Sequence, residues 1–409
     1  MQDLIAQKYA VLSTKADDFL NDLGKGYIRE FVKRGAVFID YEKLYLGFGK
    51  RKSEQFIRDS ISRNGIEVLL YQSAPYDFHY SVEFFHRLRE KVFTVMMLGD
   101  TEHYFDARDI YYAQCMDLIV VYDCLSRYRF RQYGLDAISF YSSFDKNRYF
   151  KLDIEKDIDV SFVGDISNKV ARKTYIDYIA QNAIPVEVFG NGSKNGQVSM
   201  EEMTKIFNRT RINLNFTRIS LKNALRKEPN INLRLRQIKG RAAEVALCGG
   251  FVLSEYASGI EEVFEIDKEV VVFHSNEDML DKIKYYLEHE DERNEIAENS
   301  YKRALRDYEL STAIPKLISR IEDIRRNKAK GQSELYVDNH FLRHYTTFRV
   351  AMAVKFLRLR KWSLLFQEAY IIFRNRRLNI KKALGIFLFD FFPPLKKLYH
   401  SLRFFQRGE

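Results

Sequence analysis

Short apolar runs alternate with segments of helical periodicity along the first part of the chain. Three runs have the continuous apolar character of buried strands, and each follows a helix-like segment: residues 65–71, 92–98 and 117–121. Strands buried on both faces and separated by helices are typical of a parallel sheet with crossover helices. We therefore predict an α/β domain over residues 1–156.

The same alternation restarts at Asp159. It predicts strands over residues 160–164, 186–190, 212–216, 251–255 and 270–273, and helices over 172–181, 200–209 and 242–247. Ser275 and Asp278 have the spacing of a capping box that opens one more helix. These elements predict a second α/β domain over residues 157–330. Two such domains in tandem enclose a cleft, and ligands of open α/β sheets bind beyond the carboxyl ends of the strands.

Residues 331–409 form a third region, which is basic and rich in aromatic side chains. From His340 to the C-terminus there are 15 Lys and Arg against three acidic residues, a net of +12 that leaves −2 for the first 339 residues. Two apolar stripes at helical spacing predict basic amphipathic helices on either side of Pro393-Pro394. The stripes are Ile380, Ala383, Leu384, Phe387 and Phe391, then Leu395, Leu398, Tyr399 and Leu402.

Such helices have two possible partners. Residues 376–409 either lie on an anionic membrane surface, or their apolar faces dock on the body while the cations stay solvated. Basic and aromatic sequence is also compatible with nucleic acid, but no recognition motif of that class occurs. We therefore expect no nucleic-acid partner.

The composition is that of a folded protein from a reducing compartment. Of 409 residues 46% are hydrophobic and 30% charged, and there are only six prolines, which argues against extended disorder. None of the three cysteines forms a Cys-x-x-Cys pair, so a disulfide or zinc module is not expected. The N-terminus has no secretory pattern, and the longest apolar stretch, 383–395, is too short to span a bilayer. We expect a cytoplasmic protein, held at the inner face of a membrane if the tail binds lipid.

The densest chemical signal lies between residues 218 and 244. Eight cations occur there with only Glu228 opposing them before Glu244: Arg218, Lys222, Arg226, Lys227, Arg234, Arg236, Lys239 and Arg241. In a cleft at strand ends these side chains would bind a polyanion such as a nucleoside diphosphate. On charge alone, a solvated loop is the alternative.

The same region resembles a known family. Residues 237–251, Glu255-Tyr256 and residues 259–264 are similar to the donor-site block of GT-B glycosyltransferases, and more closely to the spore-maturation (CgeB-type) glycosyltransferase-like family. The flanking segments 159–164, 188–192, 212–216 and 285–297 agree in order. The resemblance implies two Rossmann-like domains that face a central cleft and close over a nucleotide-sugar donor. It implies no obligatory metal and no cofactor besides the donor substrate.

The resemblance also implies donor-binding residues. Glu244 takes the position of a carboxylate that binds the ribose hydroxyls, and Lys239 and Arg241 lie beside the diphosphate. Without Mg²⁺, fixed cations must stabilise the charge on the departing diphosphate. The alternative for Glu244 is a surface pair with Arg241 at i, i+3.

Four further positions belong to the implied donor set. Gly164, followed by Arg172 and Lys173, resembles the first strand and turn where the superfamily places a phosphate-binding pair, with a helix-surface role as the alternative. Gly259 and Glu262 follow in the same donor-site block. The position eight residues before Glu244, where many retaining members carry a second glutamate, holds Arg236, so the anomeric outcome stays open.

Acceptor chemistry is expected in the first domain. Asp100, Glu102 and His103 directly follow a predicted strand, so their side chains are placed at the cleft. A carboxylate or imidazole there is suited to remove the proton of an acceptor hydroxyl near neutral pH. A helix cap is the alternative for Asp100.

Two weaker signals complete the analysis. Gly190 and Gly192 lack dinucleotide-loop spacing and indicate a turn, while His340 and His344 have no evident third ligand and predict no metal site. We therefore predict a metal-independent glycosyltransferase that moves a sugar to a hydroxyl of a glycan, lipid-linked or protein acceptor, in cell-surface or capsular glycan synthesis. The alternative is an inactive protein that keeps the nucleotide-sugar fold as a binding or scaffold module.

Overall fold

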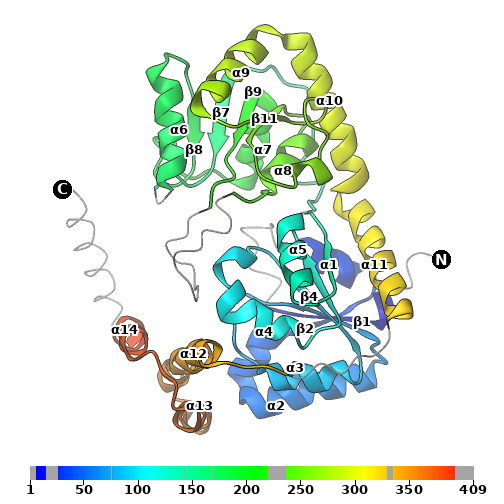
Figure 1. Ribbon diagram of the computed structural model, residues 1–409, viewed down its shortest axis with the longest axis vertical. Coiled ribbons are helices and arrows are strands. Elements are labelled where there is room, and N and C mark those ends of the chain that lie inside the picture. Colours follow the sequence, from blue (N-terminus) through cyan, green and yellow to red (C-terminus); the bar gives the residue numbers. More distant parts are fainter. Residues whose placement is uncertain are drawn as a thin grey trace.

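Two parallel β-sheets, each packed on both faces, form the two halves of the molecule (Figure 1). The structure is a computed structural model that describes residues 6–14, 26–74, 76–141, 143–167, 169–219, 236–328 and 335–391. The predicted fold class, two Rossmann-like α/β domains followed by a helical C-terminal region, is confirmed.

The first sheet has six strands in the order β2-β1-β3-β4-β5-β6, all parallel. The strands are β1 (Tyr9–Ser13), β2 (Val37–Asp40), β3 (Val68–Gln72), β4 (Phe93–Leu98), β5 (Leu118–Val121) and β6 (Ala137–Ser139). The helices are α1 (Gly26–Lys33), α2 (Tyr41–Arg63), α3 (Val82–Arg89), α4 (Ile110–Ala113) and α5 (Cys124–Gln132). The strands predicted over 65–71, 92–98 and 117–121 are β3, β4 and β5, whereas the pattern does not predict β1, β2 and β6.

The second sheet has five parallel strands in the order β11-β10-β9-β7-β8. They are β7 (Ile158–Val163), β8 (Glu187–Phe189), β9 (Thr210–Asn215), β10 (Val252–Glu255) and β11 (Val271–Phe273). The helices are α6 (Val170–Gln181), α7 (Met200–Arg209), α8 (Arg241–Leu247), α9 (Asn276–Glu288) and α10 (Glu290–Asp307). Every predicted element of this domain is present, and the Ser275 side chain caps α9 by accepting a hydrogen bond from the amide of Asp278.

Helix α11 (Leu310–Asn327) crosses back from the second domain to the first (Figure 1). Its apolar side chains Leu310, Ile314, Leu317, Ile318 and Ile321 are buried with those of β1, β3, β4 and β5 in one core cluster. The predicted second domain, 157–330, therefore needs a correction. Residues 310–327 follow that domain in sequence but complete the first domain in space, because the apolar face of α11 covers the first sheet.

The described part of the tail contains three helices joined by short non-helical segments: α12 (Asn339–Arg358), α13 (Trp362–Asn375) and α14 (Ile380–Phe391). Helix α12 docks on the first domain, where Phe341, Tyr345, Phe348, Met352 and Phe356 join a core cluster with residues of β3, β4 and α2. Helices α13 and α14 pack against α12. The predicted stripe at 395–402 lies outside the described residues.

The predicted stripe of α14 does not dock on the body. Ala383 is buried, but Ile380 is 75% and Leu384 56% exposed. Within the described residues, no helix is both long and apolar enough to cross a membrane.

Candidate active site

A cavity of about 840 Å³ lies between the two domains. Its walls come from the carboxyl ends of strands in both sheets, including Ser13, Gln72, Leu98, Val163 and Asn215. This is the location where ligands bind in open α/β sheets, and the volume suits a small organic ligand. The cavity therefore is the candidate site, and five residues predicted from the donor-site resemblance line it: Gly164, Arg172, Lys239, Arg241 and Glu244.

Gly164 and Arg172 form the wall nearest to β7. Gly164 directly follows β7, and a Cβ atom at this position would lie 2.7 Å from Cζ of Phe162 and 3.3 Å from Nη1 of Arg172. Arg172, in the first turn of α6, donates a hydrogen bond from Nη1 to the carbonyl oxygen of Asp165 at 3.0 Å. Burial and the nearby charge of Arg241 lower the pKa of Arg172. A guanidinium in this environment favours an anion as its neighbour.

Lys239 lies where the two domains meet across the cavity. Its ammonium donates to the side-chain oxygen of Gln237 at 3.0 Å and lies 3.3 Å from Oδ1 of Asp100 in the first domain. The backbone carbonyl of Lys239 accepts a hydrogen bond from the hydroxyl of Tyr141. The Lys239 side chain is thus held where the domains meet, and one of its hydrogen bonds goes to Asp100 of the first domain.

Lys169 precedes α6 and does not itself line the cavity. Burial, together with the nearby charges of Arg172 and Lys239, lowers the pKa of Lys169. The cations of this wall thus lie close enough to influence one another.

Glu244 is buried at the base of this wall and is 1% exposed. It belongs to α8, and its carboxylate pairs with Arg241 one turn earlier and accepts a hydrogen bond from the Tyr149 hydroxyl at 3.2 Å. Burial, which outweighs Arg241 and Tyr149, raises the pKa of Glu244. The i, i+3 pair with Arg241 is thus present, but it lies inside the cavity wall and not on the surface.

The three predicted catalytic residues are separated by the structure. Asp100 lines the cavity with a side chain that is 63% exposed. Glu102 is buried behind the wall, with Oε2 3.7 Å from Nη1 of Arg129. His103 does not line the cavity, and its ring lies beside Tyr104. Of the three, Asp100 has the geometry to meet a substrate in the cleft.

Gly259 and Glu262 do not line this cavity. They border a smaller cavity of about 310 Å³ that also lies between the domains. Glu262 accepts hydrogen bonds from Arg127 of α5 at 2.9 and 3.2 Å. Gly259 has φ +93°, and a Cβ there would lie 2.0 Å from the sulfur of Cys124. These two residues therefore form a direct contact between the domains.

The cation-rich stretch 218–244 separates into three groups. Arg218 and Arg236 lie against Glu255, at 3.5 and 2.8 Å between Nε and Oε1. Lys239 and Arg241 line the cavity. Lys222, Arg226, Lys227 and Arg234 lie outside the described residues. Arg236, at the position of the second glutamate of many retaining enzymes, is thus an ion-pair partner of Glu255.

Sequence reasoning missed most of the first-domain wall. Ser13, Gln72, Tyr104, Arg108 and Asp109 line the cavity. Ser13 and Gln72 end β1 and β3, so the rule of strand ends could have found Gln72. It could not find Ser13 because β1 itself was not predicted. Tyr149 was missed because it lies in a loop and reaches the site only through Glu244.

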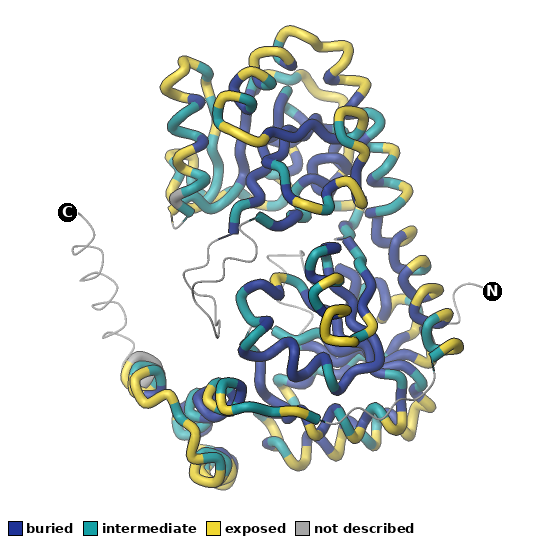
Figure 2. The backbone as a smooth tube through the Cα atoms, in the orientation of Figure 1, coloured by how far each residue is buried: buried dark blue, intermediate teal, exposed yellow. Residues whose placement is uncertain are grey.

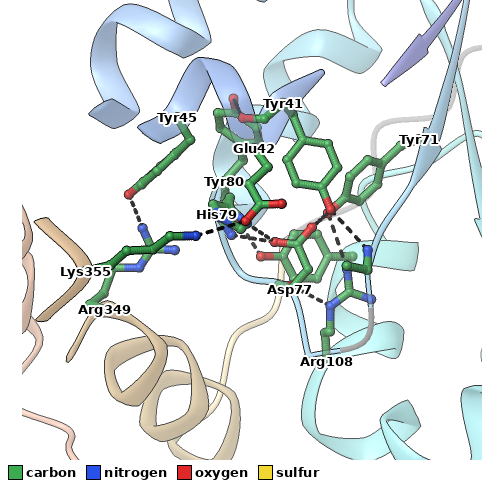
Figure 3. A network of polar contacts seen from close by, with 12 residues as sticks. Tyr41, Glu42, Tyr45, Tyr71, Asp77, His79, Tyr80, Arg108, Arg349 and Lys355 are labelled. Carbon is green, nitrogen blue, oxygen red and sulfur yellow. Dashed lines mark hydrogen bonds and ion pairs between the residues drawn. The ribbon is translucent and has the colours of Figure 1, made fainter. Parts of the chain in front are cut away.

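A buried polar network supports this wall (Figure 3). Arg108 donates from Nε to the carbonyl oxygen of Asp77 at 2.6 Å and from Nη1 to Asp109 at 2.6 Å. The Asp77 carboxylate accepts hydrogen bonds from Tyr71 at 2.9 Å and from the amide of His79 at 2.9 Å. His79 and Arg108 hold the pKa of Asp77 well below its usual range despite burial. Arg108 is therefore fixed in position at the cavity wall.

The described residues contain no group of three or more His, Cys, Asp and Glu side chains that could hold a metal ion. The rings of His340 and His344 meet edge to face, with centroids 4.9 Å apart. Burial, with the charges of His340 and Lys382, lowers the pKa of His344 to about 4.

Comparison with known proteins now adds to this geometry. Residues 171–319 match a family model described as "Glycosyl transferase-like". No curated protein matches the chain in sequence. Among solved structures, sucrose-phosphate synthase from Thermosynechococcus elongatus aligns at a TM-score of 0.54 and 10% identity, over 78% of this chain and all of its own. HepE from Anabaena, in complex with UDP and glucose, aligns at 0.53 and 13% identity, over 77% of this chain and 99% of its own.

These likenesses concern the fold of the chain and the family of its segment 171–319. The structural matches show the GT-B fold, in which two Rossmann-like domains face a cleft. The segment 171–319, which matches the glycosyl transferase-like family model, contains the cavity residues Arg172, Lys239, Arg241 and Glu244.

Proposed function

We propose that this protein transfers a sugar from a nucleotide-sugar donor in the interdomain cleft to an acceptor hydroxyl. One observation carries the proposal: Arg172, Lys239 and Arg241 converge on the 840 Å³ cavity at the strand ends. A nucleoside diphosphate is the small polyanion that fits such a wall. The CgeB-type resemblance and a role in cell-surface or capsular glycan synthesis belong to the same proposal.

The cations stabilise the leaving group in this mechanism. When the bond between the sugar and the diphosphate breaks, negative charge grows on the diphosphate oxygens. Fixed cations in a site with little water lower the energy of that charge. Arg172, Lys239 and Arg241 supply the positive charge that a metal ion would otherwise provide. We therefore propose a metal-independent reaction with no cofactor besides the donor.

Glu244 binds the ribose of the donor in this proposal. Its buried carboxylate is positioned by Arg241 and Tyr149 and lines the cavity. Two carboxylate oxygens match two neighbouring hydroxyl donors, and hydrogen bonds to a charged acceptor are stronger than neutral ones. The arrangement supports recognition of the ribose as well as the diphosphate.

Asp100 acts on the acceptor in this proposal. It lies on the first-domain side of the cleft, and Lys239 lies 3.3 Å from its Oδ1. A donor diphosphate that recruits Lys239 releases the Asp100 carboxylate to accept the proton of the attacking hydroxyl. The first-domain side of the cavity contains both aromatic and polar residues. We propose that the acceptor is a glycan, a lipid-linked molecule or a protein.

A panel of nucleotide sugars tests the donor site. UDP-glucose is the first probe, because HepE, which shares the fold, is known in complex with it; GDP-, ADP-, CMP- and dTDP-linked sugars follow. We expect one of them to raise the Tm of the wild-type chain, and Lys239→Ala and Arg241→Ala to remove that shift. Lys173→Ala is the matched control, since Lys173 is exposed and pairs with Asp177 away from the cavity. No shift with any donor would contradict the proposal, and a shift without turnover on any acceptor would favour the inactive binding module.

A further inference from the structure

Helices α13 and α14 of the tail carry many exposed apolar side chains. Nine of the eighteen large apolar side chains that are exposed in the described residues lie between positions 359 and 388. On α13 they are Trp362, Phe366, Tyr370 and Phe373, which are 56%, 68%, 63% and 69% exposed. On α14 they are Ile380, Leu384, Phe387 and Leu388. We call these eight residues the tail face.

The aromatic part of the tail face is held outward by a buried ion pair. Glu368 of α13 is 1% exposed, lies 3.5 Å from Arg349 of α12 and accepts a hydrogen bond from Tyr45 of α2. At about 100° per residue, the four aromatic side chains of α13 lie roughly 120–200° around the helix from Glu368. Anchoring Glu368 inside therefore turns all four rings to the outside, and Figure 2 shows exposed residues on the outer sides of α13 and α14.

The charged side chains of the tail segment itself are nearly all cations. Between residues 358 and 388 there are eight Lys and Arg: Arg358, Arg360, Lys361, Arg374, Arg376, Arg377, Lys381 and Lys382. The single acid in this segment is Glu368, which is turned inward. Apolar aromatic side chains bordered by cations match the boundary between the acyl chains and the headgroups of an anionic bilayer.

A groove of about 430 Å³ borders the tail face, between the first domain and helices α12 and α13. It is lined by Lys50, Arg87 and Arg374, by Tyr370 of the tail face, and by Glu83 as its acid. Cations in such a groove can bind a phosphate oxygen. The groove beside the tail face therefore also favours an anionic headgroup.

We propose that the tail face, Trp362 to Leu388 on α13 and α14, is a docking surface for an anionic lipid bilayer. The aromatic rings of α13 enter the interface of one leaflet, while Arg374, Arg377 and Lys381 bind the headgroups. The surface lies on described helices, before the basic segment 392–409, and does not depend on the identity of the donor.

Trp362 provides a direct test because it is the single tryptophan of the sequence. The full chain is mixed with vesicles of phosphatidylcholine with phosphatidylglycerol, and separately with vesicles of phosphatidylcholine alone. We expect the Trp362 emission to shift to shorter wavelength with the anionic vesicles and to be quenched by brominated acyl chains. An unchanged emission from protein that co-floats with the vesicles would show that another surface binds.

Two triple variants separate the tail face from general stickiness. Phe366→Ser, Tyr370→Ser and Phe373→Ser are made together, with Trp362 kept as reporter and the segment 392–409 intact. We expect this variant to lose at least about tenfold in vesicle partitioning. The control carries Tyr128→Ser, Phe150→Ser and Tyr285→Ser, three aromatic residues elsewhere that are 51%, 41% and 43% exposed. It should bind vesicles as the wild type does.

Charge is tested by Arg374→Gln, Arg377→Gln and Lys381→Gln together. This variant should lose the preference for anionic over neutral vesicles. Equal binding of the wild type to both vesicle types would contradict the proposal that the bilayer must be anionic. Self-association that disappears in the aromatic variant, without vesicle binding by the wild type, would assign the face to a second copy of the chain instead. The aromatic and the charge variants of the tail face should show the same donor-induced Tm shift as the wild type. The measurement of donor binding is thus independent of the measurement of vesicle binding.

Discussion

Replacing Glu244 by glutamine should separate donor binding from stability. Glutamine keeps the size of the side chain and an oxygen that accepts the hydrogen bond from Tyr149, now at 3.2 Å. The substitution removes a buried carboxylate, and burial already raises the pKa of that group. The native state therefore gives up a desolvated carboxylate, while Arg241, whose side chain is 21% exposed, can still be hydrated from the cavity.

The expected magnitudes differ for the two properties. Substituting one member of a buried pair by an isosteric neutral group should change the free energy of unfolding by no more than about 1 kcal/mol, because the hydrogen bond of Tyr149 survives. The ribose loses hydrogen bonds to a charged acceptor, worth about 1.5–3 kcal/mol. That loss weakens donor binding by roughly 10- to 100-fold.

The pH dependence has a definite sign. Because the folded-state pKa of Glu244 is raised above 4.5, the folded chain binds this proton more tightly than the unfolded chain. The contribution of Glu244 to stability is thus present below about pH 4.5 and is lost as pH rises through the raised pKa. The Tm of Glu244→Gln relative to wild type should therefore increase with pH over this window. Donor binding by the wild type should strengthen over the same window, because it needs the carboxylate.

Isothermal titration and thermal unfolding measure both properties on the same samples. Glu201→Gln is the control, since Glu201 is exposed on α7 and pairs with Lys205 away from the cavity. If Glu244→Gln binds the donor as tightly as the wild type, Glu244 does not contact the ribose. If the variant unfolds far below the wild type, the carboxylate is there to hold Arg241 and the structural explanation replaces the functional one.

Three further substitutions address the acceptor side, the domain contact and the tail. Asp100→Asn should lower kcat by about 10²- to 10⁴-fold with little change in donor affinity, and steady-state kinetics that show normal kcat would place the base elsewhere. Gly259→Ala should destabilise the chain by about 1–3 kcal/mol in denaturant unfolding, because φ is +93° and the new Cβ would lie 2.0 Å from the Cys124 sulfur; a double variant with Cys124→Ala that regains nothing would contradict the contact. Glu368→Ala leaves Arg349 buried without its carboxylate and should cost about 3–5 kcal/mol; a much smaller loss in the same assay would mean that Arg349 reaches solvent.

The second domain could be predicted almost completely from sequence, and the first only in part. Strands β7 to β11 lie in apolar runs separated by clear helical segments, so periodicity finds them. In the first domain the pattern predicts β3, β4 and β5 but not β1, β2 and β6. Helix α11 lies in the range assigned to the second domain, and nothing in its local sequence shows that its apolar face covers the first domain.

Part of the second-domain wall of the cavity was predictable because its residues are close in sequence. Lys239, Arg241 and Glu244 lie within six residues, and their spacing carries the resemblance. The first-domain wall is assembled from β1, β3, β4 and the segment at 104–109, which only the fold brings together. Gly259 and Glu262 belong to the same sequence block as Glu244, yet they contact Cys124 and Arg127 of the first domain. Proximity in sequence therefore predicted the cavity wall but not the domain contact.

The tail and the first-domain wall of the cavity are parts of one domain, and this restricts how the molecule can approach a surface. Helix α12 shares a core cluster with β3 and β4, whose carboxyl ends supply Gln72 and Leu98 to the cavity. Tyr45 of α2 bonds to Glu368 of α13, and Tyr41 of the same helix lies against the His79 and Tyr71 rings of the network around Arg108 (Figure 3). If the tail face lies on a bilayer, the contacts of α12 and α13 therefore hold the first domain, with its side of the cavity, at the lipid. This placement favours our proposal that Asp100 meets an acceptor, and it favours an acceptor presented from the membrane side.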